Sequence, residues 1–230
     1  MKTHIHREGR RMLLITYLIL IAINAVTFCY TAHWLFAITL LLSVLIIVFI
    51  TYFFRNPMRV IEVDDPNYLI APADGHVVVI EPVMETEYFH EERLQVSIFM
   101  SPFNVHANWY PIEGKVLVSS HQKGRHKGAW LPKSSTENER SLVVLQHANG
   151  TQIAVRQVAG AMARRIVTYA KPGMEVKRNQ HMGFIKLGSR VDMYLPLNTE
   201  MDVEVGDLVH GNETIMGRLS DKKEQSITNE

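Results

Sequence analysis

The sequence predicts a mainly β domain, a compact barrel or sandwich with lipoyl-like hairpin elements, preceded by a two-helix transmembrane hairpin. The first observation is an apolar run: between residues 12 and 54 the chain contains no Asp, Glu, Lys or Arg. The second is that short apolar or alternating segments recur after this run, separated by glycine and proline residues. Such spacing is typical of β-strands joined by tight turns.

The apolar run is too long for one membrane-spanning helix. A single helix over residues 12–54 would extend roughly 65 Å, whereas the hydrocarbon core of a bilayer is about 30 Å thick. We therefore expect two spans, about 12–30 and 34–54, in an anchor of residues 1–59 that is followed by a domain of residues 60–230. A cleavable signal peptide is the alternative. However, the run is much longer than the apolar region of a signal peptide, and it lacks a small-residue cleavage site.

Positive charges flank both ends of the apolar run. Lys2, Arg7, Arg10 and Arg11 precede the first span, and Arg55 and Arg59 follow the second. Because cytoplasmic flanks are enriched in Lys and Arg, both ends should lie in the cytoplasm. We expect a domain on the cytoplasmic face of the inner cell membrane, with the segment from Arg55 to Arg59 at the lipid headgroups.

The domain after the anchor has the pattern of a β protein. Seven strands are predicted, at residues 75–80, 95–100, 114–118, 141–146, 152–158, 183–187 and 190–195. Helical character is confined to residues 161–170 and the polar tail after Asp221. Residues 174–179 and 203–208 resemble each other, as hairpins of lipoyl-like domains do. No lysine stands at the hairpin tip to carry a lipoyl group, so we interpret this pattern as scaffold.

Composition excludes several classes of function. The formal net charge of +1 gives no global field that would attract nucleic acid. The single cysteine, Cys29, excludes an intrachain disulfide and a paired-cysteine metal site. Apart from His4 and His6 in the N-terminal tail, no histidines stand at a tight metal-ligand spacing. The sequence therefore predicts neither a metal site nor a nucleic-acid partner.

A Gly188-Ser189 pair separates the last two predicted strands and is the first candidate for chemistry. The Ser189 hydroxyl is within reach of the Gly188 carbonyl carbon, and glycine has no Cβ to block the approach. If a base removes the hydroxyl proton, the amide can become an ester. β-Elimination of this ester would cut the chain and leave dehydroalanine, and hydrolysis would give a pyruvoyl group. An ordinary Gly-Ser turn is the alternative interpretation.

Two other loops contain groups that could act on this turn. Asp74 lies in an Ala-Asp-Gly turn, where it either bonds the local backbone or orients an imidazole. His76 lies two residues further on and is a second candidate or a plain strand histidine. His106 follows a strand in a loop of polar and aromatic residues, and histidine titrates near neutral pH, as a general base should. A surface histidine is the alternative there.

Basic residues form two further candidate groups. Arg164 and Arg165 follow a glycine-containing turn and either clamp a phosphate or carboxylate or pair with Glu137 or Glu139. A basic loop at residues 119–133 could contact the membrane interface. It includes Lys123, Arg125, Lys127 and Trp130.

Several motifs together resemble the short bacterial and archaeal branch of the phosphatidylserine decarboxylase family, and the resemblance covers nearly the whole chain. The motifs are Phe53-Phe54-Arg55-Asn56-Pro57-x-Arg59, Ala71-Pro72-Ala73-Asp74-Gly75, Ser101-Pro102-x-Asn104-Val105-His106-x-Asn108, Glu137-Asn138-Glu139-Arg140, Ala163-Arg164-Arg165 and Leu187-Gly188-Ser189-Arg190-Val191-Asp192. The resemblance implies a proenzyme that cuts itself between Gly188 and Ser189. Its products would be a β chain, 1–188, and an α chain, 189–230, with a pyruvoyl group made from Ser189.

The resemblance also assigns roles to individual residues. The self-processing triad of Asp, His and Ser corresponds to Asp74, His106 and Ser189. Longer members carry His-x-x-His in the loop, and Trp109 stands at the second position here. His106 would therefore serve both processing and decarboxylation, or His76 would assist.

The implied substrate is a serine phospholipid in the membrane. Its amine would form a Schiff base with the pyruvoyl ketone, and loss of CO2 would convert phosphatidylserine to phosphatidylethanolamine. The implied partners are the lipid and the chain's own two fragments, and a homo-oligomer is compatible with the sequence. Three alternatives are a decarboxylase of a related serine ether lipid, a non-enzymatic membrane-anchored adaptor, and a metallopeptidase, which would need a metal-binding His/Asp cluster.

Overall fold

The structure is a computed structural model that describes residues 3–124, 138–160, 165–186 and 189–220. The chain divides into two compact units, Met1–Met58 and Arg59–Glu230.

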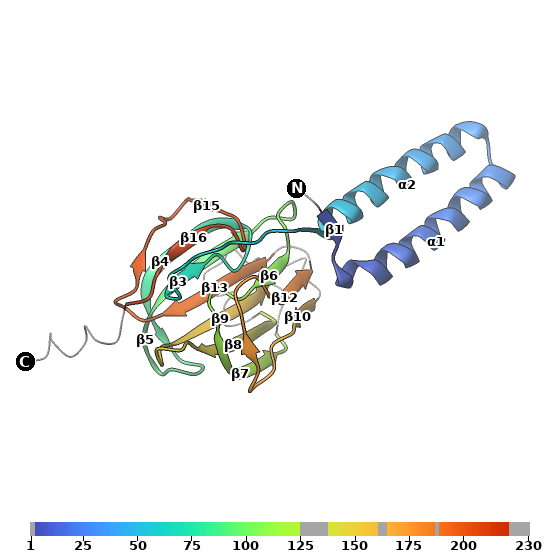
Figure 1. The fold of residues 1–230 in the computed structure, drawn as a ribbon. Helices are drawn as coiled ribbons and strands as arrows, with labels where there is room; N and C mark the ends of the chain where they lie inside the picture. The colour runs from blue at the N-terminus through green and yellow to red at the C-terminus, as the bar shows by residue number, and fades with distance from the viewer. Residues whose placement is uncertain (1–2, 125–137, 161–164, 187–188, 221–230) are drawn as a thin grey trace, which may run out of the picture. The chain divides into compact units, whose positions relative to one another are not determined.

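The first unit is a helical hairpin, α1 (Arg7–Tyr30) and α2 (His33–Phe53), drawn in blue in Figure 1. Short strands at its base, β1 (Thr3–Ile5) and β2 (Arg55–Pro57), pair in antiparallel fashion. Both helices are long and apolar enough to cross a membrane. The two apolar helices of the sequence prediction are confirmed, although α1 begins at Arg7 rather than at residue 12. Arginine and glutamate are good helix formers, so the charged first turn extends the helix.

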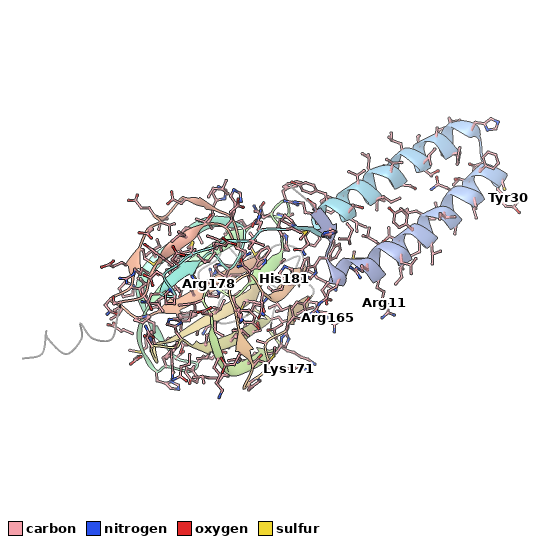
Figure 2. All side chains as sticks on the ribbon, in the orientation of Figure 1. Arg11, Tyr30, Arg165, Lys171, Arg178 and His181 are labelled. Carbon is pink, nitrogen blue, oxygen red and sulfur yellow. The ribbon has the colours of Figure 1, made fainter. Side chains whose placement is uncertain are left out.

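Polar side chains join the two helices along an otherwise apolar hairpin. Asn24 donates a 2.7 Å hydrogen bond to the hydroxyl of Ser43, and the hydroxyls of Thr27 and Thr39 are 3.1 Å apart. In an apolar environment such bonds between small polar residues hold neighbouring helices in register. Figure 2 shows Tyr30 at the connection between the helices and Arg11 toward the other end of α1.

The second unit is built almost entirely of antiparallel strands. An eight-stranded sheet has the order β11-β7-β8-β9-β13-β5-β4-β15 and curls into a half-barrel (Figure 1). Its strands are β4 (Gly75–Glu85), β5 (Glu91–Met100), β7 (Gly114–Gln122), β8 (Arg140–Gln146), β9 (Gln152–Ala159), β11 (Glu175–Val176), β13 (Ser189–Leu195) and β15 (Leu208–Val209). The predicted mainly β fold is confirmed, with a curled sheet in place of a closed barrel.

Two three-stranded sheets complete the second unit. Their orders are β10-β12-β6 and β14-β16-β3. The strands are β3 (Tyr68–Ile70), β6 (Ala107–Trp109), β10 (Arg165–Thr168), β12 (His181–Lys186), β14 (Glu200–Met201) and β16 (Ile215–Arg218). The hydrophobic core includes residues of all three sheets, for example Leu69, Ile98 and Ile185.

Alternation along β13 defines two faces of the large sheet. Val191, Met193 and Leu195 belong to the main hydrophobic core, and we call their side the core face. Tyr194 belongs instead to a smaller cluster with Leu142, Val144 and Ala154, and we call that side the opposite face. Because paired residues on neighbouring antiparallel strands point to the same side, the register assigns each strand residue to one face.

The two mutually similar segments of the sequence form the two edges of the large sheet. Residues 174–179 contain β11, which pairs with β7, and residues 203–208 lead into β15, which pairs with β4. They are edge strands of two residues each, and such short strands offer few free backbone groups for unwanted pairing.

The helix expected at residues 161–170 is wrong over its described part, because Arg165–Thr168 is strand β10. Ile166, Val167 and Thr168 are β-branched, and they pair with residues 183–185 of β12. Pairing with an existing strand therefore outweighs a short stretch of helical pattern. The polar tail after Asp221 lies outside the described residues.

Candidate active site

Ser189 is the first residue of β13 and lies in the middle of the large sheet. It pairs with Met100 at the end of β5 and with Ala159 at the end of β9. Its register with Val191 and Met193 places the side chain on the core face, where the residue is completely buried. The hydroxyl donates to the Met100 sulfur at 3.1 Å. Gly188 lies outside the described residues.

His106 is held in a fixed orientation by the loop between β5 and β6. The Asn104 side chain closes the preceding turn by accepting hydrogen bonds from the backbone and hydroxyl of Ser101. The Asn104 carbonyl then lies 2.9 Å from Nδ1 of His106. A carbonyl can only accept, so Nδ1 carries a proton and Nε2 is the basic nitrogen of the neutral ring. The His106 carbonyl accepts from the amide of Ile185, four residues before Ser189.

Asp74 is buried at the turn that precedes β4, and its carboxylate is fully engaged. Arg59 binds it with both terminal nitrogens, and the amide of Gly211 donates a further hydrogen bond of 2.8 Å. None of the hydrogen bonds of Asp74 in the described part of the chain goes to His106. The expected headgroup position of Arg59 is wrong, because its side chain is only 10% exposed in this ion pair.

Trp109 lies against the turn that contains Asp74, since its backbone amide donates to the Pro72 carbonyl at 2.9 Å. A Cβ added to Gly211 would lie 2.6 Å from the Trp109 ring and 3.0 Å from the Ala73 carbonyl carbon, so only glycine fits between them. The Arg59 guanidinium lies 6.0 Å from the Trp109 ring centre. On the neighbouring strand, His181 (labelled in Figure 2) pairs with Trp109, and their ring centres are 5.2 Å apart.

His76 faces away from Ser189. It pairs with Phe99, which in turn pairs with Arg190, so these three side chains share the opposite face of the sheet. His76 is also exposed, whereas its neighbour Val77 is part of the core. The position of His76 on the opposite face therefore does not support a role for this histidine at Ser189.

Several other candidate groups are only partly described. Arg165 is exposed and makes no ion pair with the residues that the structure describes. Glu139, one of its two expected partners, bonds the amide of Ile166 and the ring of His121 instead. Arg164, Glu137 and most of the basic loop, including Arg125, Lys127 and Trp130, lie outside the described residues.

A chain of buried neutral polar groups leads to the site and was not singled out from the sequence. The Ser141 hydroxyl donates to the Gln157 carbonyl oxygen at 2.7 Å, and the Gln157 amide donates to the Asn108 carbonyl oxygen at 2.7 Å. The Asn108 amide nitrogen lies 3.8 Å from the Met100 sulfur that also accepts from Ser189. The signal in the sequence is Gln157 itself, a polar residue among the core-facing positions Ile153, Val155 and Ala159.

Close approach of a neighbouring backbone fixes the middle of this chain. A Cβ added to Gly183 of β12 would lie 2.7 Å from the Gln157 amide nitrogen and 3.2 Å from its oxygen. The glycine thus lets β12 pass directly over the Gln157 side chain. The completely buried Ser141, Gln157 and Asn108 consequently have little room for other rotamers.

The opposite face carries charged groups in place of neutral ones. Arg156 is bound by Glu85 at 3.0 Å, Glu87 at 2.6 Å and the Tyr194 hydroxyl. Burial alone would raise the pKa of Glu85, but the amides of Phe89, Tyr88 and Glu87 and the charge of Arg156 hold this pKa below its ordinary value. Burial raises the pKa of Tyr194, which keeps its hydroxyl neutral.

Next to this cluster, Arg190 pairs with Asp192 at 2.8 Å, and the Ser97 hydroxyl donates to the same carboxylate at 2.7 Å. A cavity of about 490 Å³ lies on this face, and Arg140, Arg156 and Arg190 are among its lining residues.

Comparison with known proteins connects this arrangement to one family. The model of that family, phosphatidylserine decarboxylase, matches residues 46–217. A phosphatidylserine decarboxylase proenzyme of Phocaeicola vulgatus is 50% identical over 222 residues, which are 95% of this chain and 96% of that protein. One of Parabacteroides distasonis is 51% identical over 218 residues, 94% of this chain and 99% of that protein. One of Porphyromonas gingivalis is 54% identical over 168 residues, 73% of this chain and 76% of that protein.

The fold and these similarities define the class: the chain is a carboxy-lyase. It belongs to the phosphatidylserine decarboxylase family.

Proposed function

We propose that this chain is a membrane-anchored, self-processing, pyruvoyl-dependent decarboxylase that converts phosphatidylserine to phosphatidylethanolamine and CO2. Beyond family membership, the observation that carries this proposal is the environment of Ser189. Its hydroxyl is completely buried at the start of a central strand, close to neutral polar groups, and within the described part of the chain its acceptor is a thioether. A serine without a structural hydrogen-bonding role in such a position costs stability, which is expected where the residue serves chemistry.

The proposed processing step uses Ser189 as an internal nucleophile. Its Oγ adds to the Gly188 carbonyl carbon, the C–N bond breaks, and an ester with a free Ser189 amine forms. Removal of the Ser189 Cα proton then expels the Gly188 carboxylate and leaves dehydroalanine at the new N-terminus. Its tautomer, an imine, takes up water and releases ammonia to give the ketone. No external oxidant or reductant is required.

His106 is the proposed base for this step. Its Nδ1 proton is fixed on the Asn104 carbonyl, so Nε2 is the nitrogen that can accept a proton from Ser189. Asp74 is the proposed third member. In this arrangement Arg59 and the Gly211 amide bind its carboxylate. We therefore propose that Asp74 acts by positioning the segments that pack around Trp109.

The surroundings of Ser189 fit a pyruvoyl group. Its side chain is small, it is the first residue of β13, and the neutral amide of Asn108 contacts the same sulfur as its hydroxyl. When present, the group supplies a ketone that forms a Schiff base with the substrate amine and accepts electrons as CO2 leaves. His106 is the proposed donor of the proton that replaces the carboxylate.

The helical hairpin is the proposed membrane anchor, since both helices are long and apolar enough to span a bilayer. Basic residues at both outer ends of the hairpin support a cytoplasmic position for the second unit. Such an anchor would hold the enzyme on the membrane that contains its lipid substrate.

Intact mass spectrometry of the purified full chain tests the proposal. We expect two fragments, 1–188 and 189–230, with a pyruvoyl group in place of the second fragment's N-terminal serine. The Ser189→Ala variant should remain uncut and inactive on phosphatidylserine vesicles. A wild-type chain that stays whole after long incubation, or two fragments with an unmodified serine, would contradict it.

A further inference from the structure

We propose that Asn108 is a catalytic hydrogen-bond donor in the self-cleavage, held in orientation by Gln157 and Ser141 as positioning residues. Asn108 would donate to the oxygen that gains negative charge as Ser189 adds to the Gly188 carbonyl. This inference rests on the proposed function and adds a specific role to the buried polar chain.

The direction of the Asn108 amide follows from its partners. The Gln157 amide nitrogen can only donate, so the Asn108 atom that it contacts at 2.7 Å must be the carbonyl oxygen. The Ala107 carbonyl can only accept, so the other Asn108 amide atom, 3.2 Å from it, must be the NH2 nitrogen. The Gln157 oxygen in turn accepts from the Ser141 hydroxyl, in the same direction along the chain. The Asn108 NH2 group must therefore point the other way, toward Met100.

Among the described residues, one of the two N–H groups of the Asn108 amide is weakly engaged. The NH2 group contacts the carbonyl of the preceding residue, Ala107, at 3.2 Å and the Met100 sulfur at 3.8 Å. A thioether is a poor acceptor. In a completely buried amide, an N–H with no better described acceptor than a thioether is costly, unless a stronger acceptor appears during the reaction.

The weakly engaged donor lies close to the reacting serine. Ser189 and Asn108 both contact the same sulfur atom, at 3.1 Å and 3.8 Å respectively. The hydroxyl and the amide thus share one sulfur as a neighbour, and each can leave this poor acceptor at little cost. Asn108 also lies two residues after His106, so the same short segment supplies both the base and the donor.

The test is the cleavage rate of freshly made full-length protein, followed by mass spectrometry. Asn108→Ala removes the donor, and Asn108→Asp replaces the NH2 group by oxygen while keeping the shape. Both variants should cleave about 100-fold more slowly, the loss typical for one oxyanion donor. Gln157→Glu removes the amide that orients Asn108 and should slow cleavage by about 10-fold.

Ser97→Ala is the matched control. Ser97 is as completely buried as Asn108 and is hydrogen-bonded to Asp192, but it lies on the opposite face. It should lower the unfolding temperature and leave the cleavage rate at the wild-type value. If the Asn108 variants cleave like wild type, or lose rate only as much as Ser97→Ala at equal loss of unfolding temperature, Asn108 has a structural role and the inference is wrong.

Hydroxylamine identifies the step, because it cuts an ester but not the uncleaved amide. Asn108→Ala treated with hydroxylamine should release fragment 189–230 about 100-fold more slowly than wild type, because formation of the ester is the slowed step. Release of fragment 189–230 with an unmodified serine at the wild-type rate would place the defect after ester formation and overturn the inference. Uncut wild-type protein would instead count against the proposed function itself.

Discussion

Ser189 and Arg190 are consecutive residues, yet they face two environments built in different ways. On the core face, Ser189 lies near Asn108 and Gln157, which are neutral and joined by hydrogen bonds in a single direction. On the opposite face, Arg190 pairs with Asp192, one of several buried ion pairs. Buried charges are tolerated only when they are paired, and such pairs resist change. Neutral groups can leave weak partners more readily, which supports the proposed reactivity of Ser189.

The largest effect on the rate of self-cleavage is expected for a substitution of His106. His106→Asn keeps a donor for the Asn104 carbonyl but removes the basic Nε2. A positioned general base contributes roughly 10²- to 10⁴-fold, so cleavage should slow by at least about 100-fold. Mass spectrometry gives the rate, and an unchanged unfolding temperature shows that the loop is intact. Cleavage at the wild-type rate would remove His106 from the mechanism.

Glu85→Gln tests the opposite face, where the expected loss is in stability. It weakens the partner of buried Arg156 and should lower the free energy of unfolding by about 1–3 kcal/mol at pH 7. The rate of cleavage of the folded protein should remain at the wild-type value. Slower cleavage at equal stability would show that the two faces are coupled.

The loss of stability in Glu85→Gln should depend on pH, and the direction of this dependence follows from the pKa of Glu85. The pKa of Glu85 is lowered in the folded state, so its ionised form stabilises the protein above the ordinary glutamate value and stops doing so as the pH falls through the folded value. The difference in stability between wild type and Glu85→Gln should therefore shrink as the pH falls below about 4.3. Thermal unfolding at several pH values measures it. A difference that grows in acid would contradict the assigned shift.

The smallest effect is expected for His76→Ala. His76 is exposed on the opposite face, so its removal should change the free energy of unfolding by less than about 0.5 kcal/mol. Self-cleavage and decarboxylation should each stay within about twofold of wild type. A loss comparable to that of His106→Asn would mean that His76 reaches the site by a rearrangement of β4.

The parts of the molecule that could be predicted are those with strong local patterns. The helical hairpin could be predicted because the uncharged run is longer than any helix or strand of a soluble domain requires. Strand β9 could be predicted from the alternation within Gln152–Ala159. Ser189, His106 and Asp74 were selected as site residues through motifs, and their roles stay a prediction. The strand at Arg165–Thr168 was missed because its partner, β12, decides its conformation.

The contacts around the site could not be predicted, because they join residues distant in sequence. Arg59 reads as one more cation beside a membrane span, and only the fold brings it to Asp74. Gln157 and Asn108 are 49 positions apart and meet because β12 and β6 lie over β9 at Gly183. Sequence patterns predict the face of the sheet on which a residue lies. They do not predict which distant segment packs against that residue.

The position of Ser189 at the start of β13 also determines what holds the proposed fragments together. The described part of the 189–230 fragment supplies a central strand between β5 and β9, the edge strand β15 beside β4, and β16 beside β3. A cut before Ser189 removes one covalent bond but none of this pairing. Because strands of the short chain pair with strands of the long chain, the two chains should unfold in a single transition and separate only in denaturant.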